Sequence, residues 1–329
     1  MNLIIFGSTG DLVKRKVLPA LQSIGNIDVF AFGRQSLTHE EYQEFACKDC
    51  VPHFKKKLNY QQIDIKQQDI CAECIPYLDK DNENLVYISL PPDLILDTLK
   101  ALAKLKHKNY KLKILIEKPF GENLKNALEL KDFLQKNNLY ENTFISDHYL
   151  FKENILNLNN KIKQNIKIIT LEKLCLENRF YYDNVGALRD MIQSHIFNIL
   201  FKLNLKDFEI IEYKRAQYQE YAKELGKESD TETYINLKLK SHNKIIELIT
   251  GKAFNEKLSI IEIDNKKIEI DKKNENPYIK LFQSFFENKK HLFPTIEQSI
   301  EAWKIIEKIE KSKPKLDFYE KNSCVNDFI

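Results

Sequence analysis

The stretch Asn-Leu-Ile-Ile-Phe-Gly-Ser-Thr-Gly-Asp-Leu, residues 2–12, decides the fold of the first half of the chain. Residues 2–6 are an apolar run of the kind that forms a buried strand, and the turn after them leads into a basic amphipathic helix that is predicted to run through Leu21. Gly7 and Gly10 would let the backbone approach a pyrophosphate, whose charge the free amides of a helix N-terminus stabilise. The pattern is Gly-x-x-Gly instead of Gly-x-Gly-x-x-Gly, and a glycine turn after a strand also occurs without any ligand.

Strands and helices alternate along the rest of the first half, which is typical of a parallel sheet covered on both faces. The predicted strands are residues 28–32, 59–65, 85–90, 113–116 and 143–146, with helices opening at a capping box over 38–41 and spanning 93–107. We therefore predict a doubly wound, Rossmann-type nucleotide-binding domain over residues 1–150. Polar clusters at 117–121 and 147–153 follow two of the strands, and ligands of such sheets bind at the carboxyl ends of the strands.

The second half shows strand-like alternation with short connections, which implies a mainly antiparallel sheet with packed helices. Its predicted strands are residues 166–175, 207–217, 231–239, 244–250 and 258–264. We expect residues 151–329 to form an α+β domain. A predicted helix over 187–200 is the main exception to the strand pattern, and we expect it to pack between this sheet and the nucleotide domain, where ligands commonly bind.

Chemically active side chains are concentrated in residues 179–195, Arg-Phe-Tyr-Tyr-Asp-Asn-Val-Gly-Ala-Leu-Arg-Asp-Met-Ile-Gln-Ser-His. At roughly 100° per residue, His195 stacks above Met191 and Ile192 on the apolar face of the predicted helix, and Asp190 lies about 140° round from it. A histidine on such a face is either a catalytic base or a hydrogen-bonded core residue. The spacing alone leaves both interpretations open.

Composition argues against two classes of partner. The 329 residues include 51 basic and 48 acidic side chains, a net charge of +3, and the lysines are scattered among glutamates, so we expect no nucleic-acid partner. The apolar residues 3–6 are too few for a signal peptide, and no run approaches membrane-spanning length. We expect no membrane partner and a cytoplasmic location.

Four of the six cysteines have the spacing Cys47-x-x-Cys50 and Cys71-x-x-Cys74, which lies at the edge of a zinc-ribbon pattern. Both pairs also fall in segments predicted as amphipathic helices, where residues three apart share a face and small thiols simply pack. Zinc binding and packing are the two alternatives.

Arg34 follows the second predicted strand, where a fold that binds NAD usually has an acidic residue for the ribose hydroxyls. A guanidinium instead offers forked donors that match phosphate oxygens. We therefore predict NADP as the coenzyme, although a surface arginine at a strand end is also common.

Several of these motifs together resemble those of the glucose-6-phosphate dehydrogenase family. Residues 179–195 contain its Tyr-Tyr-Asp, Gly-Ala-Leu-Arg-Asp-Met and Gln-Asn-His motifs at the family's spacing, with Ser194 as the one departure. The cluster 117–121 reads Glu-Lys-Pro-Phe-Gly, 147–153 reads Asp-His-Tyr-Leu-Phe-Lys-Glu, and 251–257 reads Gly-Lys-Ala-Phe-Asn-Glu-Lys. The resemblance spans nearly the whole chain.

The resemblance implies oxidation of glucose 6-phosphate at C1 by NADP, the first step of the oxidative pentose phosphate pathway. It implies that His195 is the catalytic base and that Asp147 orients it. The implied substrate-binding residues are Lys118, His148, Tyr149, Lys152, Glu172, Asp190, Lys252 and Lys257. The implied cofactor-binding residues are Gly7, Ser8, Thr9, Gly10, Asp11, Leu12, Arg34 and Lys118. The family supplies no metal site here.

The chain departs from the family at three pocket positions, where Ile145 and Ile249 replace arginines and Phe151 replaces a glycine. We expect the Phe151 ring to narrow the phosphate pocket. The chain is also shorter than family members, with losses in the sheet that forms the family's dimer interface and, in some members, a structural NADP site. We expect no structural coenzyme, and a homodimer stays open. The alternatives are another NADP-dependent sugar or sugar-phosphate dehydrogenase and a catalytically silent NADP-binding or partner-binding protein.

Overall fold

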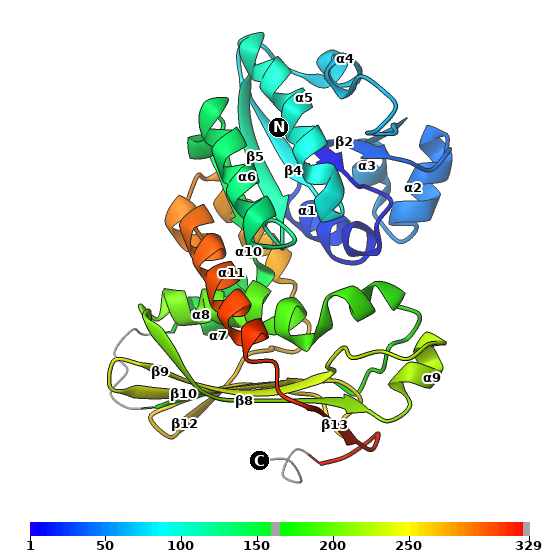
Figure 1. Cartoon of the computed structure of the whole chain (residues 1–329). Helices are drawn as coiled ribbons and strands as arrows, with labels where there is room; N and C mark the ends of the chain where they lie inside the picture. The colour runs from blue at the N-terminus through cyan, green and yellow to red at the C-terminus, as the bar shows by residue number, and fades with distance from the viewer. Residues whose placement is uncertain (159–164, 325–329) are drawn as a thin grey trace. The chain divides into compact units, whose positions relative to one another are not determined.

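The computed structural model describes residues 1–158 and 165–324, which divide into two compact units (Figure 1). Unit 1 comprises Met1–Phe151 and Asn276–Ile300, and unit 2 comprises Lys152–Glu275 and Glu301–Ile329. The chain therefore returns to unit 1 after completing most of unit 2, which the sequence did not indicate. It returns because helix α10 (Pro277–Phe286) has an apolar face that packs on α1 and on the short helix η4 of unit 1.

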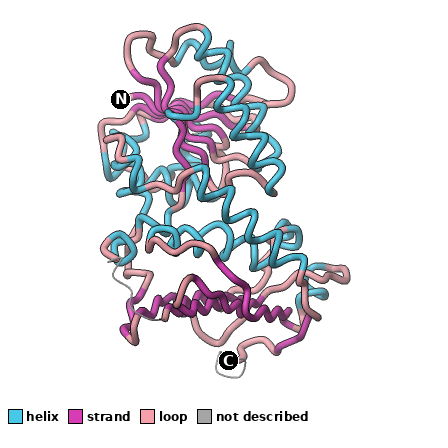
Figure 2. The backbone as a smooth tube through the Cα atoms, turned by 60° about the vertical axis from the view of Figure 1, so that its left-hand side comes forward, coloured by secondary structure: helices cyan, strands magenta, loops and turns pink. Residues whose placement is uncertain are grey.

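Unit 1 contains a six-stranded parallel sheet, as the sequence predicted (Figure 2). Its strand order is β3-β2-β1-β4-β5-β6. The strands are β1 (Asn2–Phe6), β2 (Asp28–Gly33), β3 (Leu58–Gln62), β4 (Glu83–Ile88), β5 (Lys111–Glu117) and β6 (Thr143–Ser146). Leu3 to Phe6 are at most 1% exposed, because helices cover both faces of a doubly wound sheet. The strand order reverses at β1, and Phe6 at its end pairs with both Phe32 and Ile88.

The helices of unit 1 include those in the connections between these strands, and the last two belong to the segment that returns after most of unit 2. They are η1 (Val13–Val17), α1 (Leu18–Ile24), α2 (His39–Cys47), α3 (Pro52–Lys55), α4 (Ile70–Cys74), η2 (Ile75–Tyr77), α5 (Pro92–His107), α6 (Leu124–Lys136), η3 (Tyr140–Asn142), η4 (His148–Phe151), α10 and η7 (Lys290–Leu292). The predicted capping box is confirmed, since the Thr38 amide donates to Glu41 Oε2 (2.7 Å) and the Glu41 amide donates to Thr38 Oγ1 (3.2 Å).

Unit 2 contains a seven-stranded sheet with the order β12-β11-β7-β10-β9-β8-β13. Its strands are β7 (Ile166–Leu171), β8 (Phe208–Tyr218), β9 (Tyr234–Ser241), β10 (Lys244–Gly251), β11 (Leu258–Ile263), β12 (Lys266–Glu269) and β13 (Leu316–Tyr319). Four neighbouring pairs are antiparallel, but β10 runs parallel to β7 and β13 runs parallel to β8. The sheet is thus mixed although mainly antiparallel, because strands that are not consecutive in the chain become neighbours.

The helices of unit 2 include the segment that carries His195. They are α7 (Glu153–Leu156), η5 (Phe180–Asn184), η6 (Leu188–Ile196), α8 (Phe197–Lys202) and α9 (Tyr221–Leu225), and α11 (Ile296–Lys311) begins in unit 1 and ends in unit 2. The segment predicted as one α-helix over 187–200 is a π-helix, η6, that continues as α8. Single-turn π-bulges are the usual form of this geometry, and they frequently lie at functional sites.

The four cysteines of the zinc-like spacing do not supply four thiolates. Cys47 and Cys50 form a disulfide, whereas Cys71 and Cys74 are free and buried on α4. Burial raises the pKa of the Cys74 thiol to about 12, which disfavours the thiolate that a metal needs. The packing alternative therefore describes Cys71 and Cys74, and the sequence did not indicate the disulfide.

Among the described residues, no helix is both long enough and apolar enough to cross a bilayer.

Candidate active site

The turn after β1 can accept only glycine at its first position. Gly7 has φ +82°, and a Cβ atom there would lie 2.0 Å from the Ser89 carbonyl oxygen. The amides of Gly7 and Ser8 both donate to the Phe32 carbonyl oxygen at 3.0 Å, so the turn is fixed between β2 and β4. The backbone becomes helical at Asp11, which directs the free amides of the first turn towards the carboxyl edge of the sheet. A glycine turn that leads into a helix N-terminus is an arrangement that can bind a pyrophosphate.

Arg34 lies beside this turn, at the end of β2. A Cβ atom on Gly33 would be 2.8 Å from Thr9 Cγ2, so the strand end and the glycine turn are in close contact. The exposed Arg34 follows directly, and its carbonyl oxygen accepts a hydrogen bond from Gln62 Nε2 (3.3 Å). The Tyr60 hydroxyl donates to the next carbonyl, that of Gln35, at 2.5 Å. The backbone that carries Arg34 is therefore held next to the predicted coenzyme site.

A buried carboxyl, Glu117, lies next to Lys118. The hydroxyls of Tyr87 (2.6 Å) and Ser146 (2.8 Å) donate to its Oε2 atom, and the Tyr278 hydroxyl donates to Oε1 (3.3 Å). Burial raises the pKa of Glu117, and it raises the pKa of both tyrosines well above the ordinary value. The phenols therefore stay protonated and act as donors. Sequence reasoning missed this cluster, although Glu117 stands in the same five-residue motif as Lys118.

Tyr278 links this cluster to the predicted phosphate site. Its ring stacks on the His148 imidazole, with the centroids 5.6 Å apart and the planes at 17°. Tyr149 contacts two other predicted site residues of this segment. Its ring lies edge-on to the His148 ring, with the centroids 5.1 Å apart, and its amide donates to Asp147 Oδ1 (3.0 Å). Tyr278 comes from α10, so the C-terminal part of the chain completes this site in unit 1.

Replacing Glu117 with glutamine should change how the stability of the protein depends on pH. Because the pKa of Glu117 is raised in the folded state, its contribution to stability is present at low pH and is lost as the pH rises from about 4.3, the unfolded value, through the folded value. We expect the free energy of unfolding of the wild type, relative to Glu117→Gln, to decline over that range in urea titrations. Glu122→Gln, an exposed change in the same unit, serves as the control. Parallel pH profiles for wild type and Glu117→Gln would contradict the prediction.

In unit 2, His195 lies in η6 and is 2% exposed, and its neighbours Gln193 and Ser194 are also buried. The start of this helix is anchored by Glu232, whose Oε1 atom accepts the Leu188 amide at 3.1 Å. A Cβ atom on Gly186 would lie 2.4 Å from the same Oε1 atom, so glycine is required in the turn before the helix.

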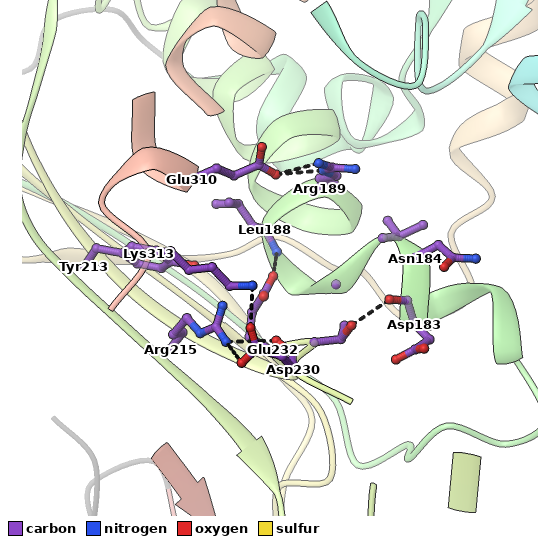
Figure 3. A pocket seen from close by; sticks show the side chains of 13 residues that line it. Asp183, Asn184, Leu188, Arg189, Tyr213, Arg215, Asp230, Glu232, Glu310 and Lys313 are labelled. Carbon is purple, nitrogen blue, oxygen red and sulfur yellow. Dashed lines mark hydrogen bonds and ion pairs between the residues drawn. The ribbon is translucent and has the colours of Figure 1, made fainter. Parts of the chain in front are cut away.

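A pocket of about 340 Å³ lies beside this anchor (Figure 3). Most of its charged side chains are paired, Arg189 with Glu310 (2.8 Å) and Lys313 with Asp230 (2.5 Å), while the buried Arg215 pairs with the same Asp230. The pocket is thus lined by several ion pairs, which lie beside the start of η6.

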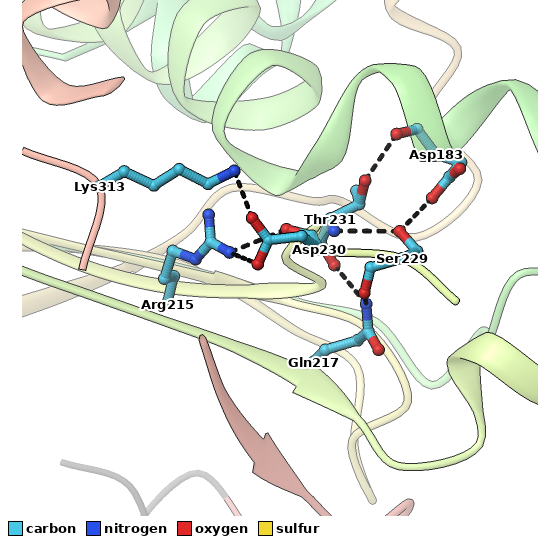
Figure 4. A network of polar contacts seen from close by, with 7 residues as sticks. All are labelled: Asp183, Arg215, Gln217, Ser229, Asp230, Thr231 and Lys313. Carbon is cyan, nitrogen blue, oxygen red and sulfur yellow. Dashed lines mark hydrogen bonds and ion pairs between the residues drawn. The ribbon is translucent and has the colours of Figure 1, made fainter. Parts of the chain in front are cut away.

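Asp183, in the Tyr-Tyr-Asp motif, forms polar contacts with a segment that lies farther along the chain (Figure 4). Its side chain accepts Ser229 Oγ and pairs with Lys227 at 2.8 Å, and its carbonyl oxygen accepts Thr231 Oγ1 at 2.6 Å. Burial would raise the pKa of Asp183, but the donors Lys227, Ser229 and Thr231 outweigh it and hold the pKa below its usual value. This aspartate therefore stabilises the segment before η6.

Three of the predicted substrate residues gather around Tyr182. Lys252 Nζ pairs with Glu172 Oε2 at 2.6 Å and lies 4.8 Å from the centroid of the Tyr182 ring. Burial raises the pKa of Tyr182 well above its usual value, and the carboxylates of Asp190 and Glu172 contribute to that rise. Two carboxylates and an ammonium around a phenol suit the hydroxyls of a sugar.

Two further predicted residues meet at a carboxylate that sequence reasoning missed. Asp271 binds Lys152 Nζ through Oδ1 (2.5 Å) and Lys257 Nζ through Oδ2 (2.9 Å). Burial works to raise the pKa of Asp271, but the two lysines outweigh it and lower the pKa. No motif in the sequence marks Asp271, so only the structure could reveal it.

Comparisons with known proteins agree with these features. Residues 4–157 match the family model described as glucose-6-phosphate dehydrogenase, NAD binding domain, and residues 150–212 match the one described as glucose-6-phosphate dehydrogenase, C-terminal domain. The glucose-6-phosphate 1-dehydrogenase of Helicobacter pylori is 30% identical over 290 residues, 72% of this chain and 68% of that enzyme. The chain belongs to the glucose-6-phosphate dehydrogenase family.

Other glucose-6-phosphate dehydrogenases show how much of their length and fold the chain shares. The enzyme of Rhizobium meliloti is 32% identical over 236 residues, 60% of this chain, and that match spans about half (48%) of the enzyme. A structure of glucose-6-phosphate dehydrogenase in complex with its substrate has a TM-score of 0.83 at 19% identity, and the Mycobacterium avium enzyme has 0.82 at 20%; each covers 98% of this chain and 94% of its own. At these identities the solved structures show the shared fold.

Three positions that the resemblance marked as departures from the family are buried. Ile145 is 2% exposed, and Ile249 and Phe151 are fully buried. The Phe151 ring packs against Phe293 at 4.8 Å in the core of unit 1. Burial among other aromatic side chains stabilises this apolar ring. The expected narrowing of the phosphate pocket by Phe151 stays a prediction.

The predicted site residues thus form two groups in each unit. Unit 1 brings Gly7–Leu12 close to the Arg34 segment and groups Asp147, His148 and Tyr149 with Tyr278. Unit 2 gathers Glu172, Asp190 and Lys252 around Tyr182, and Lys152 and Lys257 around Asp271. His195 belongs to unit 2, whereas Asp147 and Lys118 belong to unit 1. Their convergence stays a prediction.

Proposed function

We propose that the chain oxidises glucose 6-phosphate at C1 with NADP, yielding 6-phosphogluconolactone and NADPH. The observation that carries the proposal is the match of residues 4–157 and 150–212 to the two models of this family. The glycine turn at Gly7 supports the coenzyme assignment, because it leads into a helix at Asp11 whose N-terminal amides can bind a pyrophosphate. In this proposal unit 1 binds the coenzyme and unit 2 binds most of the sugar.

His195 is the general base of the proposed reaction. It takes the proton of the C1 hydroxyl as the hydride leaves C1, which turns the C1–O bond into the carbonyl of the lactone. NADP, when bound, is the hydride acceptor. An imidazole suits the task because its unperturbed pKa, roughly 6.5, leaves the neutral base available near neutral pH. Asp147 orients the imidazole and stabilises its protonated form.

Binding of the sugar phosphate is assigned to the remaining motif residues. Lys152, Lys257, His148 and Tyr149 bind the phosphate, which aligns C1 with the nicotinamide. Glu172, Asp190 and Lys252 bind sugar hydroxyls, and Lys118 contacts both a substrate hydroxyl and the coenzyme. The close pairing of Lys252 with Glu172 supports this division of roles, since the two side chains already share one site.

A direct assay tests the proposal. Purified protein is mixed with glucose 6-phosphate and NADP or NAD, and the absorbance of the reduced nicotinamide is followed. Turnover with NADP is expected, and its absence with both coenzymes would overturn the proposal and favour a catalytically silent protein.

Ile145 and Ile249 are buried apolar residues where the family has arginines, so a panel of other sugars and sugar phosphates tests the alternative that the substrate differs. Light scattering after size-exclusion chromatography tests the homodimer that the resemblance leaves open.

Arg34→Asp is expected to reverse the coenzyme preference. The guanidinium donates charge-assisted hydrogen bonds to the 2′-phosphate of NADP, and an aspartate at this place accepts from the ribose hydroxyls of NAD. We expect the ratio of kcat/KM for NADP to that for NAD to fall by about ten- to a hundredfold, as the loss of one or two such bonds implies. Lys56→Asp makes the same change of charge at an exposed position of unit 1 and should leave the ratio unchanged.

A further inference from the structure

Lys152 and Lys257 reach the same carboxylate from different parts of unit 2. Lys152 precedes α7, Lys257 precedes β11, and Asp271 lies in the loop that follows β12. The Asp271 carboxylate uses both oxygens, with Oδ1 2.5 Å from one Nζ atom and Oδ2 2.9 Å from the other. It bridges the two ammonium groups in the way that a phosphate would.

Burial explains why such a bridge is needed. The Lys152 side chain is only 9% exposed, whereas the side chains of Asp271 and Lys257 are 34% and 66% exposed. A buried ammonium without a counter-ion is costly, so an internal anion stabilises the site before any ligand arrives. A bound phosphate would supply that charge instead, and a carboxylate left in place would then repel it.

We propose that Asp271 is an internal counter-ion that competes with the substrate's phosphate for Lys152 and Lys257 and so sets the affinity of the site for phosphorylated sugars. This inference rests on the proposed function for the identity of the substrate, although the competition itself concerns any phosphate ligand. The carboxylate is displaced when phosphate binds. Asp271 thus weakens the binding of every phosphate ligand by a similar factor, so that only ligands whose sugar makes further contacts bind tightly.

The proposal assigns the displacement to the side chain, because the segment around Asp271 is tied to α7. The backbone on either side of Asp271 is fixed, because the Glu269 carbonyl oxygen accepts Asn154 Nδ2 at 2.7 Å, and Glu275 Oε1 accepts the Glu153 amide at 2.7 Å. Lys272 adds an ion pair with Glu153 at 2.7 Å. The loop can therefore keep its place while the carboxylate rotates from the two lysines.

Asp271→Asn tests the proposal in the full chain, first with inorganic phosphate as the probe. The variant removes the charge and keeps the shape, and we expect calorimetry to show phosphate binding about tenfold more tightly than in the wild type. The KM for glucose 6-phosphate should fall by a similar factor with kcat unchanged. Asp271→Glu, which keeps the charge, should behave as the wild type, and Asp317→Asn, an exposed change in unit 2, is the control. Asp271→Ser is measured in parallel, so that the test does not depend on one variant folding.

The opposite result has a clear meaning. If Asp271 only orients the two lysines or binds a sugar hydroxyl, the neutral variants will bind phosphate and glucose 6-phosphate more weakly or with the same affinity, and the proposal is overturned. Failure of the proposed function gives a different result, because neither the wild type nor the variant would then turn over glucose 6-phosphate. Asp271→Asn would still bind inorganic phosphate more tightly than the wild type.

Discussion

His195→Asn is expected to lower kcat for glucose 6-phosphate by about 10²- to 10⁴-fold, the usual contribution of a general base, and to leave the KM close to that of the wild type. Asparagine can still donate and accept hydrogen bonds in the buried site, but it cannot take the proton of the C1 hydroxyl. Steady-state kinetics with saturating NADP measure the effect. A large rise in KM with unchanged kcat would instead make His195 a binding residue.

The buried position of His195 calls for a control on folding. His242→Asn makes the same substitution at an exposed turn of unit 2, where φ is +53° and asparagine is well tolerated. This variant should keep full activity. The unfolding midpoint of His195→Asn should be compared with it, and a variant that is folded but retains ordinary turnover would refute the catalytic assignment.

Gly7→Ala is expected to destabilise the protein by about 2–4 kcal/mol and to raise the Kd for NADP at least about tenfold. An L-residue at φ +82° costs about 1–2 kcal/mol, and the new Cβ atom would lie 2.0 Å from the Ser89 carbonyl oxygen, so the ends of β1 and β4 must separate. That movement deforms the turn on which the pyrophosphate would lie. Denaturant titration and coenzyme binding measured by fluorescence check the two effects.

Gly25→Ala is the matched control for this change. Gly25 lies in the same unit with φ +74°, and a Cβ atom there would meet nothing within 4 Å. The control therefore carries the conformational cost without the collision. Equal stabilities of the two variants would show that the contact with Ser89 does not constrain the turn.

Local signals predicted the fold of each half well. The predicted strands 2–6 and 143–146 match β1 and β6 in extent, because strands buried on both faces are rich in apolar residues. Local patterns could not show that β10 lies parallel to β7, or that η6 has π geometry, since both depend on contacts between distant segments. The family motifs predicted Glu172 and Lys252, which the structure brings together.

The residues that sequence reasoning missed are those whose role depends on partners far along the chain. Glu117 accepts hydrogen bonds from the hydroxyl groups of Tyr87 and Tyr278, which are 30 and 161 positions away in the sequence. Asp271 lies 119 positions from Lys152 and belongs to no motif. No local sequence pattern distinguishes a single aspartate or tyrosine of this kind from a surface residue. These partners can therefore be identified only from the folded structure.

The return of α10 to unit 1 has a consequence for synthesis on the ribosome. Domains near the N-terminus generally fold while the rest of the chain is still being made. Here Tyr278 supplies a hydroxyl to Glu117 and a stacking surface to His148, so the nucleotide-binding half cannot be finished until translation has passed residue 286. Until then the nascent chain carries an incomplete first sheet unit, with a polar cluster still open, while the residues between Phe151 and Asn276 are being added.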